Sequence, residues 1–443
     1  MSQEKSSAVN AKKIVSEMSL EEKVAFCSGK NFWYLKSLAR LDLPSIMVTD
    51  GPHGLRKQDS QADHVGLNAS VPATCFPTAS ALACSWNVDL MHEIGVALGK
   101  ECVKENVSVL LGPAMNIKRH PLCGRNFEYF SEDPVLTGEM AAGLIEGVQS
   151  QGVGTSVKHY AVNNQERGRM FVDAIVDERS LREIYLKGFE IAVKKSQPWT
   201  VMSSYNRVNG VYCGEDDFLL NQILRKEWGF EGLVVTDWGA TNDRVKSVSA
   251  GLDLEMPASG GVNDRLVLAA IRSGVLPETH LDRIIQRNVE LILKGSGVRG
   301  RDVELNKTLH HGLAKRAAGE SMVLLKNEGR QLPWKTSSQI AVIGAFAKHP
   351  RYQGAGSSQV TPTSLDNAYN WIASALGDKG SIAYAAGYDP LRSELDQGLL
   401  EEAVKVAASA SAVVLFVGLP AIDESEGFDR QHLDIPRQQE LLI

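Results

Sequence analysis

The fold is decided by the stretch LRKEWGFEGLVVTDWGA, which occupies residues 224–240. Its first residues are the end of a helical pattern over Asp216–Trp228, in which apolar residues recur at three- and four-residue spacing. The short β-branched run Leu233–Asp237 follows. Helical patterns that alternate with short apolar strands are typical of a parallel sheet built from βα units. The stretch ends in a change from apolar to polar residues, which places Asp237 and Trp238 at the strand terminus.

The same alternation is repeated on both sides of this stretch. The candidate strands are Ser45–Asp50, Val107–Pro113, Thr155–His159, Thr200–Tyr205, Leu233–Asp237 and Leu252–Met256. Helical patterns lie between them, as in Val88–Glu105 and Arg179–Lys195. Enough units occur before Gly295 for a (β/α) barrel of the TIM type, a fold that takes about 250 residues. We therefore expect residues 1–295 to form a TIM-like α/β barrel.

A second α/β domain is expected after the barrel. Residues 296–306 (SGVRGRDVELN) are rich in glycine and charge and are predicted to be a linker. Apolar runs in residues 307–443 predict buried parallel strands of an α/β sandwich, at Met322–Leu325, Ile340–Gly344 and Val413–Gly418. The sequence ends at Ile443, just where another helix is expected to begin. This domain is therefore expected to be incomplete, with few strands and an exposed sheet edge.

Composition and charge exclude several classes of protein. The 443 residues are 43% hydrophobic and 23% charged, as in globular proteins, and the net charge of −6 offers no basic surface for nucleic acid or membrane. The N-terminus lacks the apolar core of a signal peptide, and six scattered cysteines form no CxxC pair. We expect a cytoplasmic protein with reduced thiols that acts on a neutral small molecule. A homo-oligomer is compatible with the sequence.

Polar residues recur where the candidate strands end. The set comprises Asp50, Arg56, Arg125, Lys158, His159, Tyr205, Asp237 and Trp238. The carboxyl ends of barrel strands converge on one face, where active sites lie. Each residue alone has an ordinary explanation, such as a helix N-cap for Asp237, core packing for Trp238 or a surface ion pair for Arg56. Because these explanations would all have to hold on one rim, we interpret the set as a binding site.

Five motifs together strongly resemble glycoside hydrolase family 3, in its β-glucosidase branch. They are VTDGPHGLR (48–56), GPAMNIKRHPLCGRNFEYFSEDP (112–134), SVKHYAVNNQERGR (156–169), VMSSYNRVNG (201–210) and the stretch 224–240. The resemblance runs from about Ser19 to the end of the chain. It implies a retaining β-glucosidase that releases terminal β-D-glucosyl residues from oligosaccharides or glycosides by double displacement, without a cofactor or a metal ion.

The resemblance also implies roles for individual residues. Asp237 matches the nucleophile of the family. Positions that bind the hydroxyls of the sugar or hold the nucleophile are matched by Asp50, Arg56, Arg125, Lys158, His159, Arg169 and Tyr205. Trp238 offers an apolar platform for a sugar face. These residue types suit a sugar, since carboxylates accept hydrogen bonds from hydroxyls while Lys and Arg donate, and a nearby cation is expected to keep Asp237 ionised.

The acid/base of this family comes from a loop of the second domain, which here corresponds to DESEGFDR (423–430). Glu426 matches the family pattern, Glu424 is the alternative, and a plain acidic surface loop stays open. Burial at the domain interface is expected to raise the pKa of Glu426, as a general acid requires. A second loop, GAGSSQ (354–359), is expected to border the site, with Ser358 as a contact.

Several alternatives stay open. A β-xylosidase of the same family differs in substrate by one hydroxymethyl group. An N-acetylglucosaminidase is disfavoured, because such enzymes resemble KHFPGHG where this chain has KHYAVNNQERGR. Lys158 could be the Schiff-base lysine of an aldolase. An incomplete second domain could also leave an inactive, sugar-binding remnant. The histidines His53, His120 and His432 lack partners at the spacing of metal ligands.

Overall fold

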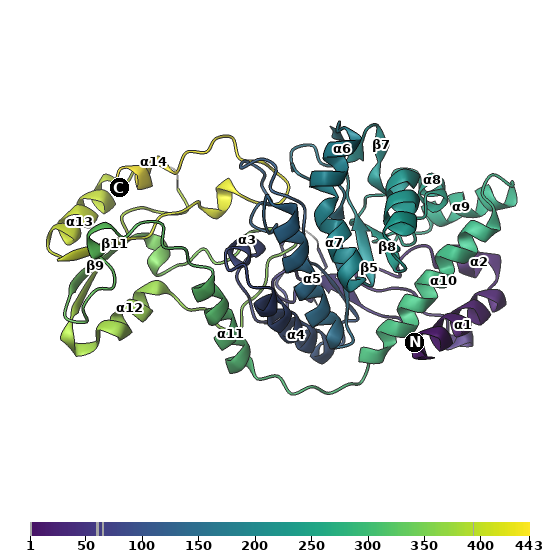
Figure 1. The fold of residues 1–443 in the computed structure, drawn as a ribbon, viewed down its shortest axis with the longest axis horizontal. Helices are drawn as coiled ribbons and strands as arrows, with labels where there is room; N and C mark the ends of the chain where they lie inside the picture. The colour runs from purple at the N-terminus through teal and green to yellow at the C-terminus, as the bar shows by residue number, and fades with distance from the viewer. Residues whose placement is uncertain (1, 59–61, 64–65, 393) are drawn as a thin grey trace.

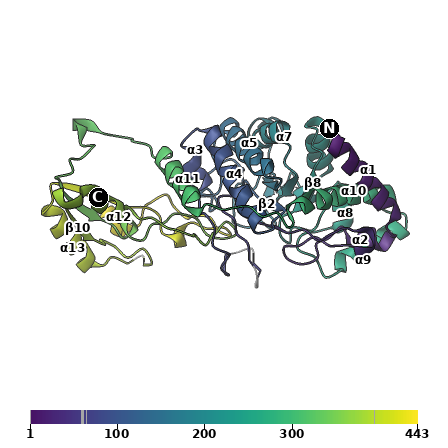
Figure 2. The same cartoon turned by 90° about the horizontal axis from the view of Figure 1, so that it is seen from below.

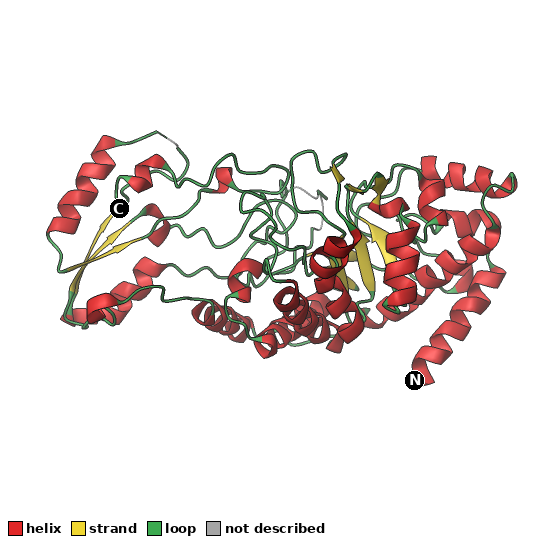
Figure 3. Cartoon of the chain, turned by 45° about the horizontal axis from the view of Figure 1, so that its top comes forward, coloured by secondary structure: helices red, strands yellow, loops and turns green. Residues whose placement is uncertain are grey.

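The computed structural model describes residues 2–58, 62–63, 66–392 and 394–443. It has a larger helix-rich part that holds the N-terminus and a smaller part that holds the C-terminus (Figure 1). The strands gather in two separate places, with long loops between them (Figure 3). The described residues therefore contain two parallel α/β sheets in separate parts of the chain, as the alternation of helices and strands predicts, and a third, small sheet.

A five-stranded parallel sheet lies at the centre of the larger part, with its strands in chain order. They are β1 (Val48–Asp50), β2 (Val109–Leu111), β3 (Gly154–Tyr160), β5 (Thr200–Ser203) and β8 (Leu233–Thr236). Every residue of these strands is buried, as expected for a parallel sheet covered by helices. Beyond β8, single parallel bridges join Val235 to Leu254 and Glu255 to Ser28. The predicted strand Leu252–Met256 thus continues the barrel through bridges alone.

Helices surround this sheet, with α4 packed on α5, α5 on α7 and α1 on α10. They are α1 (Ser2–Glu17), α2 (Leu20–Ala25), α3 (Ala79–Ala83), α4 (Val88–Lys104), α5 (Pro134–Ser150), α6 (Glu178–Ser180), α7 (Lys187–Ser196), α8 (Arg244–Ser249), α9 (Val262–Arg272) and α10 (Glu278–Gly295). Side chains of Asn87 and Asp133 accept backbone N–H groups in the first turns of α4 and α5, which fixes where these helices begin.

Two of the predicted helices are not regular α-helices. The span Arg179–Lys195 is divided between α6, a π-helical turn at Leu181–Tyr185 and α7. The span Asp216–Trp228 contains the π-helix Phe218–Glu227. A separate small sheet beside the barrel consists of β4 (Asp173–Ala174), β6 (Arg207–Val208) and β7 (Val211–Tyr212). Periodicity in the sequence indicates a helix but does not separate α from π geometry.

The smaller part contains a three-stranded parallel sheet in the order β10-β9-β11. Its elements are β9 (Gln339–Ile343), α12 (Ala368–Leu376), β10 (Ser381–Ala385), α13 (Gln397–Ala408), β11 (Ala412–Leu415) and α14 (Arg437–Glu440). The prediction of a buried strand at Met322–Leu325 is wrong. These residues have no regular structure, and Leu325 is 91% exposed. An apolar run becomes a strand only where a partner strand lies beside it, and none of the described strands pairs with this run.

The residues between the two parts include a 3-10 turn at Ser296–Val298 and otherwise lack regular structure up to α11 (Lys307–Glu320). Helix α11 packs on α3 and α4 of the barrel, and the Nδ1 atom of His310 lies 2.7 Å from Oε1 of Glu101. Figure 2 shows the same arrangement from below, with α11 next to α3 and α4. The division into a barrel (1–295), a linker (296–306) and a second domain (307–443) stays a proposal.

Candidate active site

Polar residues at the ends of two barrel strands and just after two others meet at one edge of the sheet. Asp50 ends β1, Lys158 and His159 lie near the end of β3, Tyr205 follows β5, and Asp237 comes directly after β8. They line one narrow cavity, together with Met202, Trp238, Ser357 and Glu426. The cavity lies at the carboxyl ends of the parallel strands, where barrel proteins place their active sites.

Asp237 presents one unsatisfied carboxylate oxygen in this cavity. Its Oδ1 accepts a hydrogen bond from the backbone N–H of Trp238 at 2.7 Å. Within the part of the chain that the structure describes, Oδ2 has no hydrogen-bond partner, and it lies 3.7 Å from Nε2 of His159. Burial raises the pKa of Asp237 above its ordinary value and outweighs the opposing effect of Arg125 and Arg169. The cations we expected are present, but burial has the larger effect on this carboxyl.

His159 is held as a neutral imidazole. Burial, followed by the nearby charges of Arg125 and Lys158, holds its pKa well below the ordinary value. Its Nδ1 lies 3.3 Å from the hydroxyl of Tyr129. The side chain of Asn116 fixes the backbone of His159 from both sides, accepting from its N–H at 2.7 Å and donating to its carbonyl at 2.8 Å. This histidine is therefore suited to hydrogen bonding and not to carrying charge.

Carboxylates and cations alternate along one wall of the site. Lys158 Nζ lies 3.4 Å from Oδ1 of Asp50 and 3.7 Å from Oε1 of Glu128. Glu128 in turn accepts from Nε of Arg125 at 2.7 Å. Burial raises the pKa of Asp50, against the opposing charges of Lys158 and Arg56. Glu128 was absent from our predicted site, although it stands three residues after Arg125 in the motif GRNFE.

Four predicted site residues do not line the cavity: Arg56, Arg125, Arg169 and Ser358. Arg56 is fully buried and binds Asp63 Oδ1 at 3.1 Å, with its Nη1 3.5 Å from Oδ2 of Asp50. Arg56 is therefore placed to orient Asp50 and not to contact a ligand in the cavity. Ser358 is also fully buried, and the cavity is lined by the neighbouring Ser357 instead. The loop GAGSSQ does border the site, but the residue at the cavity is one position earlier than predicted.

Glu426 enters the cavity from the smaller part of the chain. Its Oε1 lies 2.8 Å from Nη1 of Arg169 and 3.6 Å from Nη1 of Arg125. Its Oε2 accepts the backbone N–H of Ser357 at 2.7 Å. Burial alone would raise the pKa of Glu426, but the two arginines and this N–H outweigh burial and hold the pKa well below the ordinary value. Our expectation of a raised pKa was wrong because it left out these partners.

Glu424 does not reach the cavity. Its Oε2 is bound by Nη2 of Arg351 at 2.8 Å, and it is absent from the cavity lining. Of the two glutamates that the sequence left open, only Glu426 lines the cavity that contains Asp237.

Aromatic side chains build the floor next to Asp237. Trp238 donates from Nε1 to the carbonyl of Phe32 at 3.0 Å, and its ring centroid lies 5.3 Å from that of Trp33. The hydroxyl of Tyr205 donates to the carbonyl of Trp238 at 3.0 Å, and the guanidinium of Arg169 lies 4.8 Å above the Tyr205 ring. The aromatic side chains thus position the segment that carries Asp237 and offer an apolar surface.

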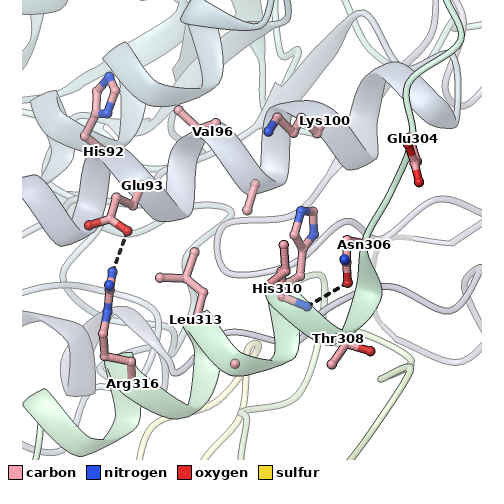
Figure 4. Close-up of a pocket in the computed structure, with 13 residues that line it drawn as sticks. His92, Glu93, Val96, Lys100, Glu304, Asn306, Thr308, His310, Leu313 and Arg316 are labelled. Carbon is pink, nitrogen blue, oxygen red and sulfur yellow. Dashed lines mark hydrogen bonds and ion pairs between the residues drawn. The ribbon is translucent and has the colours of Figure 1, made fainter.

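A larger hollow lies between α4 and α11, away from these residues (Figure 4). It is lined by residues such as Lys100 and His310, and Arg316 is paired with Glu93 across it. None of the predicted site residues lies in this hollow.

Among the described residues, no group of three or more His, Cys, Asp or Glu side chains is arranged to hold a metal ion. No helix in that part of the chain combines the length and apolarity that crossing a membrane requires.

A parallel barrel whose strand ends carry paired carboxylates and cations, covered by a glutamate from a second α/β unit, is the arrangement of a glycoside hydrolase. The comparison with protein families agrees: the glycosyl hydrolase family 3 N-terminal domain matches residues 35–291, and the C-terminal domain of the same family matches residues 322–443. The chain belongs to glycosyl hydrolase family 3.

Three relatives illustrate the likeness. The chain is 56% identical over 436 residues to the thermostable β-glucosidase B of Acetivibrio thermocellus, a match that covers 98% of this chain and 58% of the relative. It is 47% identical over 441 residues to an exo-α-(1→6)-L-arabinopyranosidase of Bifidobacterium longum, covering 97% and 58%. A crystal structure of a family 3 β-glucosidase from Bifidobacterium adolescentis superposes with a TM-score of 0.89 at 47% identity, covering 96% of this chain and 61% of that one.

Proposed function

We propose that this chain is a retaining β-glucosidase that hydrolyses terminal, non-reducing β-D-glucosyl residues. The observation that carries the proposal is that Asp237 and Glu426, which come from different parts of the chain, line one cavity together with Asp50, Lys158 and His159. Two relatives are named β-glucosidases, which supports this substrate class. Because the chain spans 58% of the length of the curated relatives described above, their activity is proposed for it and not transferred.

The proposed reaction has two steps. In the first, Asp237 attacks the anomeric carbon, the glycosidic carbon–oxygen bond breaks, and Glu426 gives its proton to the leaving oxygen. In the second, water attacks the same carbon, Glu426 takes a proton from the water, and the bond to Asp237 breaks. The free oxygen of Asp237 in the cavity is the atom suited to the first attack.

The remaining groups suit recognition of sugar hydroxyls. The carboxylate of Asp50 can accept two hydroxyl protons, while Lys158 and the neutral His159 can donate or share hydrogen bonds. Lys158 is held between the carboxylates of Asp50 and Glu128, an arrangement that favours hydroxyl binding over the Schiff-base chemistry of an aldolase.

Glu426 must leave its arginine partners before it can act as an acid. In the structure it is bound to Arg169, and its low pKa means that it carries no proton near neutral pH. The cavity is narrow with Glu426 in this position. We therefore propose that the entering sugar displaces Glu426 from Arg169, and that its pKa rises once the cation no longer contacts it.

Proton NMR of the chain with an aryl β-D-glucoside tests this function. Early appearance of β-glucose supports a retaining β-glucosidase, whereas early α-glucose would show inversion and contradict the covalent mechanism. If no glucose forms but the protein binds glucose, the sugar-binding alternative is favoured over catalysis. The variant Asp237→Asn, which should release no glucose, controls for a contaminating enzyme.

A pentopyranosidase is the second candidate, because the relative from Bifidobacterium longum is named an arabinopyranosidase. β-D-Xylosides and α-L-arabinopyranosides both lack the hydroxymethyl group of a β-D-glucoside, which changes discrimination by only about 1–3 kcal/mol, and the arabinopyranosides also have the opposite configuration at C4. Comparing kcat/KM for the three aryl glycosides separates the candidates. We expect the glucoside to have the highest value, and a higher value for either pentoside would reassign the substrate.

A further inference from the structure

We propose that Asp429 and Glu166 form a latch that fastens the loop carrying Glu426 to the barrel and so sets the position of the acid/base. The inference rests on the proposed function. Neither residue lines the cavity. Both are therefore positioning residues, and they act on the reaction through the place they give to Glu426.

Asp429 belongs to the smaller part of the chain, and its side chain contacts two loops of the barrel. Its Oδ1 accepts the backbone N–H of Gly124 at 3.0 Å and that of Glu166 at 2.9 Å. Its Oδ2 accepts the backbone N–H of Arg167 at 2.9 Å. One carboxylate thus satisfies three backbone donors from loops that lie far apart in the sequence, and hydrogen bonds to an ionised acceptor are among the stronger ones in proteins.

Glu166 makes the reciprocal contact, from the barrel to the loop that carries Glu426. This buried barrel residue accepts the backbone N–H of Gly427 at 2.8 Å, next to the acid/base itself. The same oxygen accepts from Nη1 of Arg169 at 2.7 Å, and that nitrogen also binds Glu426 at 2.8 Å. Glu166 therefore holds both the residue after Glu426 and the arginine that Glu426 contacts.

The shape of the loop matches this attachment. A side chain at Gly124 would overlap the backbone carbonyls of Ser425 and Phe428, so the barrel loop and the acid/base loop are in direct contact. Gly427 has a φ of +99°, in the region that favours glycine. The backbone N–H of Arg430 also donates to the carbonyl of Leu122 at 2.9 Å. The loop that carries Glu426 is therefore attached to the barrel through backbone groups. The carboxylate of Asp429 accepts N–H groups of the barrel, and the carboxylate of Glu166 accepts an N–H group of the loop.

A nearby aspartate offers a matched control. Asp434 lies five residues after Asp429 and its side chain is 85% exposed. Among the described residues its carboxylate is paired only with His432, at 3.5 Å, while its backbone carbonyl accepts from Arg430. Changing Asp434→Asn removes the same charge from the same segment without touching the barrel. It should leave turnover unchanged.

The test compares a substrate whose cleavage needs general-acid catalysis with one whose cleavage does not. Methyl β-D-glucoside has a poor leaving group and depends on proton donation, whereas 2,4-dinitrophenyl β-D-glucoside has an acidic leaving group that departs unaided. For Asp429→Ala and for Glu166→Gln, we expect kcat/KM on the methyl glucoside to fall by about 10²-fold or more, as when a general acid is misplaced, while kcat/KM on the dinitrophenyl glucoside stays close to that of the unchanged protein.

Azide provides a second signature of the same defect. Loss of base assistance slows attack by water on the glycosyl–Asp237 ester, so kcat on the dinitrophenyl glucoside should fall. Azide anion needs no base; it attacks the anomeric carbon, the bond to Asp237 breaks, and β-glucosyl azide forms. We expect azide to restore turnover in Asp429→Ala but not to change it in Asp434→Asn.

Equal losses on both substrates, or no loss on either, would overturn the latch. If the unchanged protein hydrolyses neither substrate, the proposed function fails. Amide hydrogen exchange then tests the latch independently of activity. Asp429→Ala should raise the exchange rates of the amides of Gly124, Arg167 and Gly427, while Asp434→Asn should not. Unchanged protection in Asp429→Ala would refute the latch whatever the activity.

Discussion

At the scale of the single residue, Asp237 is the carboxylate on which turnover should depend most. Asn in its place keeps the shape and can still accept from the N–H of Trp238, but it cannot form the glycosyl ester. We expect Asp237→Asn to lower kcat by several orders of magnitude, on activated and unactivated glucosides alike, without unfolding the protein. Asp243→Asn, which replaces the N-cap of α8 by another good N-cap, is the control and should retain turnover. Equal activity of both variants would remove Asp237 from the mechanism.

Glu166 should make stability depend on pH. Burial raises its pKa from the ordinary 4.5 to about 7, against the opposing charges of Arg125 and Arg169. The folded state then binds a proton more tightly than the unfolded state, so this stabilising contribution is full below pH 4.5 and is lost as the pH rises through 7. Glu166→Gln cannot titrate. Relative to this variant, the unchanged protein should lose up to about 3 kcal/mol of unfolding free energy across that window.

Urea unfolding of both proteins from about pH 5 to about pH 8 measures this difference. The difference in unfolding free energy between them should change below pH 7 and level off above it. A difference that stays constant across the range would show that Glu166 titrates as it does in the unfolded chain.

Single residues of the candidate site could be predicted when they stand at strand ends. Asp50, Lys158 and His159 follow this rule, and the structure places them in one cavity. Glu128 and Asp429 could not be predicted in this way, because their role depends on which loops meet in space. The pKa of Glu426 shows the same limit: burial is visible in the sequence pattern, but its contacts with arginines from another part of the chain are not.

At the scale of elements, Asp253 joins the barrel strand β8 to two helical segments. This fully buried carboxylate accepts from the backbone N–H of Val234 at 2.7 Å, from Nη2 of Arg225 at 2.6 Å and from Nε of Arg287 at 2.7 Å. Asp253→Ala would leave two largely buried cations without their partner. We expect it to lower the free energy of unfolding by about 3–5 kcal/mol.

Asp302→Ala is the matched control for Asp253. Its ion pair with Lys104, at 2.9 Å, lies on the surface with the Asp302 side chain 90% exposed. Such a solvent-screened pair contributes little to stability, so we expect the unfolding free energy of Asp302→Ala to stay close to that of the unchanged protein. Chemical denaturation of both variants checks the contrast, and similar losses would mean that burial does not decide the strength of the Asp253 contacts.

The run Met322–Leu325 makes a second test at this scale. Leu325 is exposed, so Leu325→Lys should change the free energy of unfolding by less than about 0.5 kcal/mol. Ile343→Ala, in the buried central strand β9, should cost about 2–5 kcal/mol. Urea midpoints compare the two. A large loss in Leu325→Lys would show that this run packs against a partner in solution.

Elements were predictable where a local apolar pattern coincides with tertiary pairing. The runs that became β3 and β8 are short, buried and flanked by helices, so pattern and structure agree. The strand β10 was missed because its sequence, SIAYA, is only partly buried and gives a weak pattern. Met322–Leu325 has a stronger pattern and is no strand, since a strand needs a neighbour as well as a composition.

At the scale of the whole molecule, the site exists only where the two parts of the chain meet. The barrel supplies Asp237 and the groups suited to hydroxyls, and the smaller part supplies Glu426 on a loop that reaches across to the barrel (Figure 1). The two-part organisation was predictable from the restart of the strand pattern after residue 306. The contact between the parts was not, because it is made largely by backbone groups of loops whose sequences carry no periodic signal.

Sugar binding at this junction should be coupled to proton uptake. In the structure, Arg125 and Arg169 hold Glu426 ionised, and a sugar that displaces it from them should raise its pKa. Between the free and bound pKa values the complex then binds more protons than the free protein, so affinity should fall as the pH rises through the bound-state value. Calorimetric titration with glucose in buffers of different ionisation enthalpy counts the protons directly. We expect uptake of up to about one proton per site below neutral pH, and none in Glu426→Gln, whose amide does not titrate. Equal uptake in Glu426→Gln would assign the proton to another group, and no uptake in the unchanged protein would mean that Glu426 keeps its arginine partners when the sugar is bound.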